Sequence, residues 1–390
     1  MKNDLRLLHK ADRRVRLGHA WIFSNEVDIA KTPLTAFSPG DVAVVKDAYG
    51  KPVGTAYVNP GALICARMLT SDAKAVIDGN WWFGRVRRAL DLRERLYSSP
   101  HYRAVYAESD GCPGLIVDRY GDVLVAQLNT AGVAKMRDDV IGALERACKP
   151  RGILLRSAAT VRQFEGIDEF DEPVGDVPDV ADVCEDNAVF SAPLRKGQKT
   201  GYFFDQRDNR SRLARYVRDA RVLDVYSYIG SWAVRAMKYG AQSATCVDSS
   251  ELALTHAAEN ARRNAVEIET QRGDAIETME TFAAAGRRFD VVIVDPPSLI
   301  KRRKDIQAGQ AMYERLNRAA LRVLEPGGIL VSCSCSHHLS PEMLQRTILQ
   351  AAKDCGRRMQ ILERHAHAPD HPIHPAMPET EYLKAFFVRA

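Results

Sequence analysis

Apolar and polar positions along the chain change their period twice. Before about residue 72 the apolar runs are short and alternate with polar positions, as in 41–47 and 62–69, and the turn-forming stretch 48–54 lies between these two runs. Alternation with a period of two, bounded by turn residues, is typical of β-strands. The pattern therefore predicts a small β-barrel over residues 1–72.

The next block, residues 73–185, mixes helical and strand patterns. Apolar residues recur every three or four positions in 81–96 and 135–148, which predicts two amphipathic helices. Residues 110–128 favour a β-hairpin around Tyr120-Gly121-Asp122. The run 168–182 is acidic and rich in proline and glycine, so it predicts a surface loop or a domain boundary. We expect a central α+β domain here.

From residue 186 onward, apolar strands alternate with amphipathic helices. The strand patterns run up to Ser227, Asp248 and Asp295, and a further strand covers the glycine-rich approach to Cys335. Alternation of this kind predicts a mostly parallel sheet with helices on both faces. We therefore expect an α/β, Rossmann-like C-terminal domain over residues 186–390.

Composition narrows the class of protein. A chain of 390 residues suits two or three domains. It contains no apolar run of about 18 residues, and its charged start lacks the apolar region of a signal peptide, so we expect a cytosolic protein without a membrane partner. Its eight cysteines show neither a CxxC pair nor zinc spacing, which predicts reduced thiols and no metal site.

Basic residues cluster in 6–19, 85–96 and 301–304, although the net charge is only +5. Such clusters serve either as phosphate-binding surfaces or simply as solvated faces. Three clusters with aromatic residues nearby favour a polyanionic partner. The candidate RNA-binding residues are Arg13, Arg14, Arg16, His19, Lys301 and Arg302.

Three polar turns follow successive strands of the predicted sheet. The first has one glycine, Gly230, and lacks the GxGxxG pattern that a pyrophosphate requires. Asp248 follows the second strand, where an acid can accept hydrogen bonds from ribose hydroxyls, and Asp274 could accept from an adenine amino group. Each acid alone fits a helix cap or turn as well. Together, in this order, they favour S-adenosylmethionine as the cofactor.

The fourth strand ends in Asp295-Pro296-Pro297. Two prolines cannot continue a central strand, so they form a rigid turn. Such a turn can hold the amino edge of a base against a methyl donor. We expect Asp295 and Pro296 to border the cofactor and Asp295 to act in catalysis.

Cys333 and Cys335 lie two residues apart at the end of an apolar run. They could be packing residues, metal ligands with His337 and His338, a redox pair, or one nucleophile with a bystander. Positions two apart on a strand face the same way, and Cys335 lies nearer the carboxyl end, where ligands bind. Because an Asp-Pro-Pro turn also belongs to the predicted site, we favour Cys335 as a nucleophile, with core packing as the alternative role.

At this point the chain resembles the RlmI-type 23S ribosomal RNA cytosine-5 methyltransferases, over nearly its whole length. Residues 199–210 are similar to the family's KTGxxxDQR signature, which is highly specific. The stretch 18–27 looks like the opening of the family's PUA domain, and 370–387 is similar to its C-terminal segment. This sequence departs from the family at Ser298-Leu299 and at His337-His338.

The resemblance implies a PUA domain, a central α/β domain and a Rossmann-like methyltransferase domain. It further implies that the protein forms 5-methylcytosine in 23S ribosomal RNA, with Cys335 as the nucleophile. The residues that would surround the cofactor are Gln206, Arg207, Tyr226, Ser227, Asp248, Asp274 and Asp295.

Other functions remain open at this point. An Asp-Pro-Pro turn also suits methylation of a base nitrogen, which needs no thiol. A non-catalytic RNA-binding or ribosome assembly protein is a second alternative, and the missing glycine pattern disfavours a dehydrogenase.

Other cytosine-5 RNA methyltransferases carry a second cysteine at the Asp-Pro-Pro turn, where the nearest residue in this chain is Ser298. Water or an acid would therefore take the carbon-5 proton. The sequence leaves open the modified nucleotide, the state of the RNA and whether the protein is a homodimer.

Overall fold

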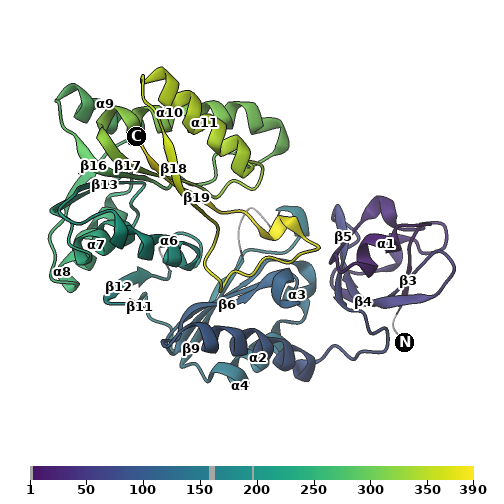
Figure 1. Cartoon of the computed structure of the whole chain (residues 1–390). Helices are drawn as coiled ribbons and strands as arrows, with labels where there is room; N and C mark the ends of the chain where they lie inside the picture. The colour runs from purple at the N-terminus through teal and green to yellow at the C-terminus, as the bar shows by residue number, and fades with distance from the viewer. Residues whose placement is uncertain (1–2, 158–162, 196) are drawn as a thin grey trace. The chain divides into compact units, whose positions relative to one another are not determined.

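A computed structural model of the chain describes residues 3–157, 163–195 and 197–390 (Figure 1). These residues divide into two compact units. The first contains Met1–Ala181, Pro193–Phe204 and Pro369–Thr380, and the second contains Asp182–Ala192, Asp205–Ala368 and Glu381–Ala390. The C-terminal segment therefore contributes to both units.

The first unit begins with a five-stranded sheet in the order β1-β3-β4-β5-β2. An isolated bridge between Leu7 and Val27 lies just beyond the ends of β1 and β2 and links the two edges of the sheet, as in the predicted small barrel. Ile22, Val45 and Ala56 are among the side chains that fill it. The strands are β1 (Asn3–Arg6), β2 (Trp21–Phe23), β3 (Asp41–Lys46), β4 (Pro52–Val58) and β5 (Ile64–Thr70), and the barrel carries helix α1 (Asp12–Arg16).

The rest of the first unit is built on a second five-stranded sheet, in the order β10-β9-β8-β7-β6. The predicted amphipathic helices are α2 (Gly79–Leu96) and α4 (Arg137–Cys148), and their apolar faces share one core with the sheet. The other elements are α3 (Ala131–Lys135), β6 (His101–Tyr106), β7 (Leu115–Tyr120), β8 (Val123–Leu128), β9 (Gly152–Arg156) and β10 (Asp171–Gly175).

The prediction of a surface loop over 168–182 was wrong for the residues in the middle of this run. Residues Asp171–Gly175 form strand β10, which pairs antiparallel with β9. The strand is polar and contains Pro173, which an edge strand tolerates because one row of its backbone groups needs no partner strand. The run does end at a boundary, because the second unit begins at Asp182. Strand β11 (Val180–Glu185) crosses that boundary and pairs with β12 (Ala188–Pro193).

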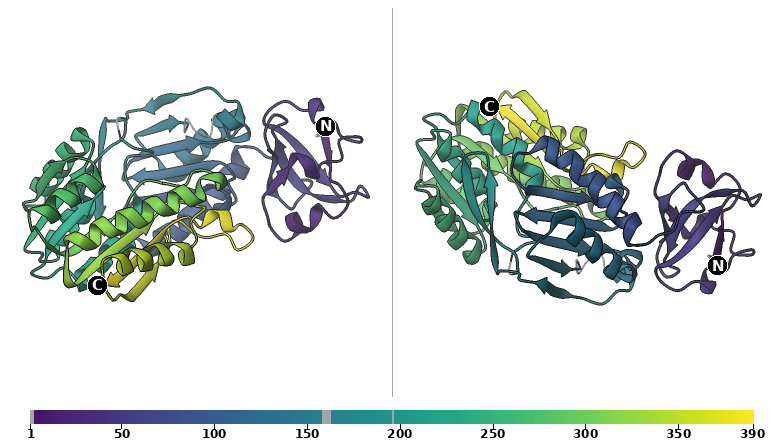
Figure 2. Two further views of the ribbon diagram at one scale, coloured as in Figure 1. Left: turned by 90° about the horizontal axis from the view of Figure 1, so that it is seen from above. Right: turned by 90° about the horizontal axis from the view of Figure 1, so that it is seen from below.

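The second unit contains a seven-stranded sheet in the order β15-β14-β13-β16-β17-β19-β18. The first five strands are parallel, β19 runs antiparallel to β17, and the edge strand β18 runs antiparallel to β19 (Figure 2). The strands are β13 (Arg221–Val225), β14 (Ser243–Asp248), β15 (Glu269–Arg272), β16 (Phe289–Val294), β17 (Leu324–Ser334), β18 (Gln360–His365) and β19 (Lys384–Arg389).

Helices cover both faces of this sheet, as the alternating pattern predicted. One apolar core joins α7 (Ser231–Lys238) and α8 (Glu251–Arg263) to one face. A second core joins α9 (Ala275–Ala284), α10 (Ile306–Val323) and α11 (Pro341–Asp354) to the other. The α/β, Rossmann-like prediction is therefore confirmed. Among the described residues, no helix has both the length and the hydropathy needed to cross a membrane.

Candidate active site at the carboxyl edge of the sheet

The parallel strands bring the predicted site residues to one edge of the second unit's sheet. Strand β13 ends at Val225, just before Tyr226 and Ser227. Strand β14 ends at Asp248, β16 ends just before Asp295, and β17 ends just before Cys335. Because parallel strands share a carboxyl edge, residues separated by more than 100 positions lie along one line, where α/β folds bind ligands.

The turn after β13 has an unusual backbone. Tyr226, Tyr228 and Gly230 have φ angles of 62°, 49° and 75°, all in the left-handed region. Left-handed backbone at residues other than glycine is costly and concentrates at functional sites. Glycine is required at position 230, because a Cβ there would lie 2.9 Å from the Cβ of Ala257. The turn thus brings its backbone against α8.

Asp248 connects two loops of this edge. One of its carboxylate oxygens accepts from the backbone N–H of Tyr228 at 2.9 Å, and the other accepts from the N–H of Ser250 at 2.9 Å. Asp274 caps α9 through the N–H groups of Ile276 and Glu277, the helix-cap role that its position also allowed. A carboxylate has about four lone-pair sites, so both acids keep acceptor capacity for a ligand.

These acids lie close to the Tyr226 ring. Burial raises the pKa of Tyr226, and together with the charges of Asp274 and Asp248 it brings that pKa to about 12. S-adenosylmethionine offers ribose hydroxyls, an adenine amino group and a positive sulfonium, so it presents donors and a positive charge. Acceptors and carboxylates beside a half-buried aromatic ring fit such a ligand.

Asp295 is fixed by two side-chain donors. Gln206 donates its amide N–H to Oδ1 at 3.0 Å, and Trp232 donates its indole N–H to Oδ2 at 3.1 Å. Burial raises the pKa of Asp295 to about 6, and the charge of Asp205 adds to this rise while the two donors oppose it. The carboxyl group therefore changes charge near neutral pH.

Gln206 and Arg207 have different surroundings. The Gln206 carbonyl oxygen accepts from Asn209 at 2.7 Å, which orients the amide toward Asp295. Arg207 instead lies 3.9 Å from the carboxylate of Glu185. Glu185 is fully buried, and it also pairs with Arg210 at 2.9 Å. Burial opposes ionisation of Glu185, but the surrounding guanidinium groups outweigh it and lower its pKa.

The two cysteines of the SCS stretch differ in their surroundings. Cys333 lies within β17, is 1% exposed and belongs to the core on the α7 face, and burial raises the pKa of its thiol. Cys335 lies one residue past the end of the strand and is only half-buried. Its S–H donates to the backbone carbonyl of Pro296 at 3.7 Å. The cysteine at position 335 therefore adjoins the Asp-Pro-Pro turn.

A cluster of hydroxyl groups holds the chain around Cys335 in place. The Ser336 Oγ lies 2.9 Å from the Tyr313 hydroxyl and 3.2 Å from the Ser298 hydroxyl. It also accepts from the backbone N–H of Ile300 at 3.1 Å, and Ser334 donates to Tyr313 at 2.8 Å. Ser298, one of the departures from the family pattern, therefore helps connect the segment after the Asp-Pro-Pro turn to the segment after Cys335.

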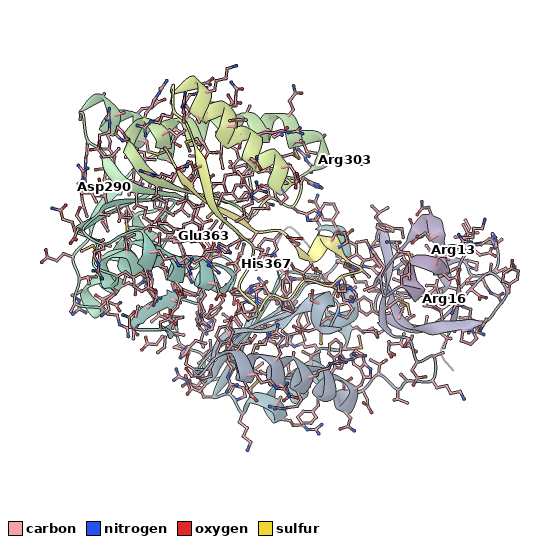
Figure 3. The ribbon with its side chains drawn as sticks, in the orientation of Figure 1. Arg13, Arg16, Asp290, Arg303, Glu363 and His367 are labelled. Carbon is pink, nitrogen blue, oxygen red and sulfur yellow. The ribbon has the colours of Figure 1, made fainter. Side chains whose placement is uncertain are left out.

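Four of the candidate RNA-binding residues have exposed side chains, although Arg16 also pairs with Asp12 and Asp47, and Arg302 pairs with Asp305. Arg13 and Arg16 are exposed on α1 and are labelled in Figure 3 with Arg303. Lys301 and Arg302 are exposed in the segment that follows β16. The other two make internal contacts, because Arg14 donates to Glu26 at 2.9 Å and to the ring of the buried His19 at 2.8 Å. Their role in RNA binding remains a prediction.

Sequence reasoning missed two polar groups of this site. Trp232 is the second residue of α7, two positions after Gly230, and nothing in the apolar pattern indicated that its N–H donates to Asp295. Lys384 begins the apolar run of β19 and is 5% exposed. The sequence signal that could have indicated this residue was a lysine at the start of an apolar strand. Within the described part of the chain, no three His, Cys, Asp or Glu side chains are grouped to hold a metal ion.

The fold and the chemistry of this edge define an S-adenosylmethionine-dependent methyltransferase. Residues 169–389 match the family described as S-adenosylmethionine-dependent methyltransferases, and residues 5–71 match PUA-like domains. The chain belongs to the ribosomal RNA large subunit methyltransferase I family. It is 35% identical to the member from Cronobacter sakazakii, with 94% of each chain covered, and 36% identical to the member from Tolumonas auensis, with 95% of each covered.

Solved structures support the fold. A crystal structure of a suggested methyltransferase complexed with SAH matches with a TM-score of 0.85 at 18% identity, covering 100% of both chains. A suggested SAM-dependent methyltransferase from Streptococcus mutans matches with a TM-score of 0.84 at 18% identity, again over 100% of both chains. At this identity the likeness concerns the fold alone.

Proposed function

We propose that the protein transfers a methyl group from S-adenosylmethionine to carbon 5 of a cytosine in large-subunit ribosomal RNA. The observation that carries this proposal is the half-buried thiol of Cys335, next to the Asp-Pro-Pro turn and beyond the strand that buries Cys333. Methylation of a base nitrogen would need the turn but no thiol. A thiol at this place favours chemistry at a ring carbon.

The substrate class rests on the relatives and on the first unit. The relatives are named for methylation of large-subunit ribosomal RNA. A PUA-like barrel with exposed Arg13 and Arg16 supports contact with a phosphate backbone. We therefore propose that the protein acts on ribosomal RNA in the cytosol and needs no membrane partner.

The proposed chemistry begins at Cys335. Carbon 5 of cytosine is a weak nucleophile, but addition of the Cys335 thiolate to carbon 6 gives an enamine that makes it reactive. When bound, S-adenosylmethionine would supply the methyl group to carbon 5 as its methyl–sulfur bond breaks, which leaves S-adenosylhomocysteine. Water or an acid–base group then removes the carbon-5 proton, and the ring expels the Cys335 thiolate. The enzyme is thereby regenerated.

Asp295 suits the proton transfers of this scheme. As the thiolate adds to carbon 6, negative charge develops on the ring, and protonation at N3 relieves it. A carboxyl group with a pKa of about 6 can share a proton with N3 near neutral pH. Gln206 and Trp232 would hold the carboxyl group in one orientation while it does so.

The test uses a strain that lacks the gene. Its large-subunit RNA is digested and analysed by mass spectrometry after complementation with the wild type, with C335A or with C333A. We expect one 5-methylcytidine to be missing from the uncomplemented strain, to return with the wild type and C333A, and to stay missing with C335A. A missing N-methylated base in place of 5-methylcytidine, or restoration by C335A, would overturn the proposal.

A further inference from the structure

Lys384 lies at the edge of the sheet that carries the candidate active site. Strand β19 runs antiparallel to β17, so it begins where β17 ends. In this register Lys384 is the partner of Ser334, the residue before Cys335. The lysine therefore enters the site from the last strand of the chain, and its side chain is almost wholly buried.

Two backbone carbonyls fix the Lys384 ammonium group. Its Nζ donates to the carbonyl of Ser336 at 2.6 Å and to the carbonyl of Tyr382 at 2.7 Å. An ammonium group has three donors, and these two are its hydrogen bonds to described residues. Lys384 thus holds the residue that follows Cys335, and its third N–H remains available to an anion beside it.

The charges around Lys384 identify that anion. Burial lowers the pKa of Lys384 to about 8, while the negative charges of Cys335 and Glu381 raise it. Cys335 comes from the end of β17, and Glu381 precedes β19. The hydroxyls of Tyr313, Ser334 and Ser336 also pack here, and the Asp295 carboxyl belongs to the turn that Cys335 contacts, where its charge opposes the thiolate. A buried cation is costly unless it is paired, and the Cys335 thiolate is the partner at the reactive end of the site.

We propose that Lys384 is a positioning residue whose buried ammonium group fixes the segment around Cys335 and stabilises Cys335 as the thiolate. This proposal rests on the proposed role of Cys335 as the nucleophile. A free cysteine has a pKa of about 8.5, so only a few per cent is thiolate at neutral pH, and an adjacent ammonium group raises that fraction. The thiol proton leaves to solvent, so no further reactant is required.

The test measures alkylation of Cys335 by iodoacetamide without RNA or cofactor. The rate at Cys335 is followed from pH 5 to pH 10 by peptide mass spectrometry in the wild type, K384M and K384R. Methionine keeps the length of the side chain but removes its charge, whereas arginine keeps the charge. We expect K384M to raise the pH of half-maximal alkylation by about one unit, which is roughly a tenfold slower reaction at pH 7, and K384R to stay near the wild type. The same pH profile in the wild type and K384M, or an equal shift in both variants, would overturn the proposal.

A reciprocal measurement in C335A covers the case in which K384M fails to fold. Lysines labelled with 13C at the ε position are titrated by NMR in the wild type and in C335A. We expect Lys384 to lose its proton at lower pH in C335A, because the variant lacks the anion. An identical titration in both proteins would refute the pairing. Neither measurement involves methylation, so retained methylation by C335A would refute the proposed function while leaving the pairing of Lys384 with the thiol intact.

Discussion

Gln206 and Asp295 are 89 residues apart in sequence, and the side-chain amide of Gln206 donates to the Asp295 carboxylate at 3.0 Å. The bond joins the KTG…DQR stretch to the Asp-Pro-Pro turn. Trp232 donates to the second carboxylate oxygen. Two helical residues, one in α7 and one at the end of the 3-10 helix Phe204–Gln206, therefore orient the carboxyl group that faces the base in our proposal. The conformation and the proton affinity of Asp295 should therefore respond to changes in these partners.

Replacing Trp232 by phenylalanine should raise the pKa of Asp295 above its value of about 6. The indole N–H stabilises the ionised carboxylate, and its loss removes about 1 kcal/mol, which corresponds to roughly 0.7 of a pKa unit. The limb of the pH profile for methylation that reports ionisation of Asp295 should move to higher pH by that amount in W232F. The matched control is W82F, because Trp82 is a buried tryptophan of the first unit. An unchanged position of that limb in W232F would show that the bond does not tune Asp295.

The stability of the protein should fall as pH rises through the range in which Asp224 is still protonated in the native state. Asp224 is fully buried, and burial raises its pKa to about 8, whereas an unfolded aspartate has a pKa of about 3.9. Between these values the unfolded chain has lost a proton that the native state keeps, so unfolding becomes easier by up to about 1.4 kcal/mol per pH unit. Above pH 8 this dependence ends.

The variant D224N tests this dependence. In the wild type, the N–H of Ala233 donates to Asp224 at 3.1 Å. Asparagine at position 224 keeps an oxygen that can accept this hydrogen bond, but it has no carboxyl proton to lose. The difference in Tm between D224N and the wild type should grow in favour of the variant from pH 5 to pH 8. A difference that stays constant over this range would mean that Asp224 ionises normally in the native state.

Replacing Glu185 by glutamine should strongly destabilise the second unit. Glu185 is fully buried and pairs with Arg210, with Arg207 and Arg235 each 3.9 Å away, so its loss removes the one buried negative charge that these three guanidinium groups share, although Arg235 keeps Asp186. Removing one partner of such a cluster costs about 3–5 kcal/mol. The exposed pair of Glu172 with Arg137 provides the control, and E172Q should cost less than about 1 kcal/mol. Similar Tm values for E185Q and E172Q would contradict this account.

Replacing Gly230 by alanine should weaken cofactor binding as well as stability. The new Cβ would lie 2.9 Å from the Cβ of Ala257, so the turn after β13 would have to shift. Gly240 has a similar left-handed φ of 92° but open space around a Cβ, so G240A carries the backbone strain of about 1 kcal/mol alone. Calorimetry with S-adenosylmethionine should give at least tenfold weaker binding for G230A and unchanged binding for G240A. Equal binding by both variants would place the turn outside the cofactor site.

The sequence predicted those parts of the site that depend on local pattern. Apolar strands that lead to Tyr226, Asp248 and Asp295 predicted a mostly parallel sheet, and a parallel sheet brings such residues to one edge. Cys333 lies within β17, whereas Cys335 lies one residue beyond its end. This difference depends on where β17 ends, and sequence pattern alone does not locate the end of a strand to one residue.

The features that the sequence did not predict depend on contacts between residues far apart in the chain. Strand β10 was missed because an edge strand can be polar and contain proline, so it carries no apolar signal. The contribution of Lys384 follows from the antiparallel pairing of β19 with β17, which joins residues 50 positions apart. The direction of the Trp232 indole is likewise set by packing of α7 against the sheet. None of these follows from propensity within a short window.

The most direct test of the central claim is to trap the covalent adduct. The protein is incubated with S-adenosylmethionine and large-subunit RNA that contains 5-fluorocytidine, in which no proton at carbon 5 can be removed after methyl transfer. We predict a stable RNA–protein complex that maps by peptide mass spectrometry to Cys335, forms equally with C333A and is absent with C335A. Full methylation of unmodified RNA by C335A, or an adduct at a residue other than Cys335, would contradict the account.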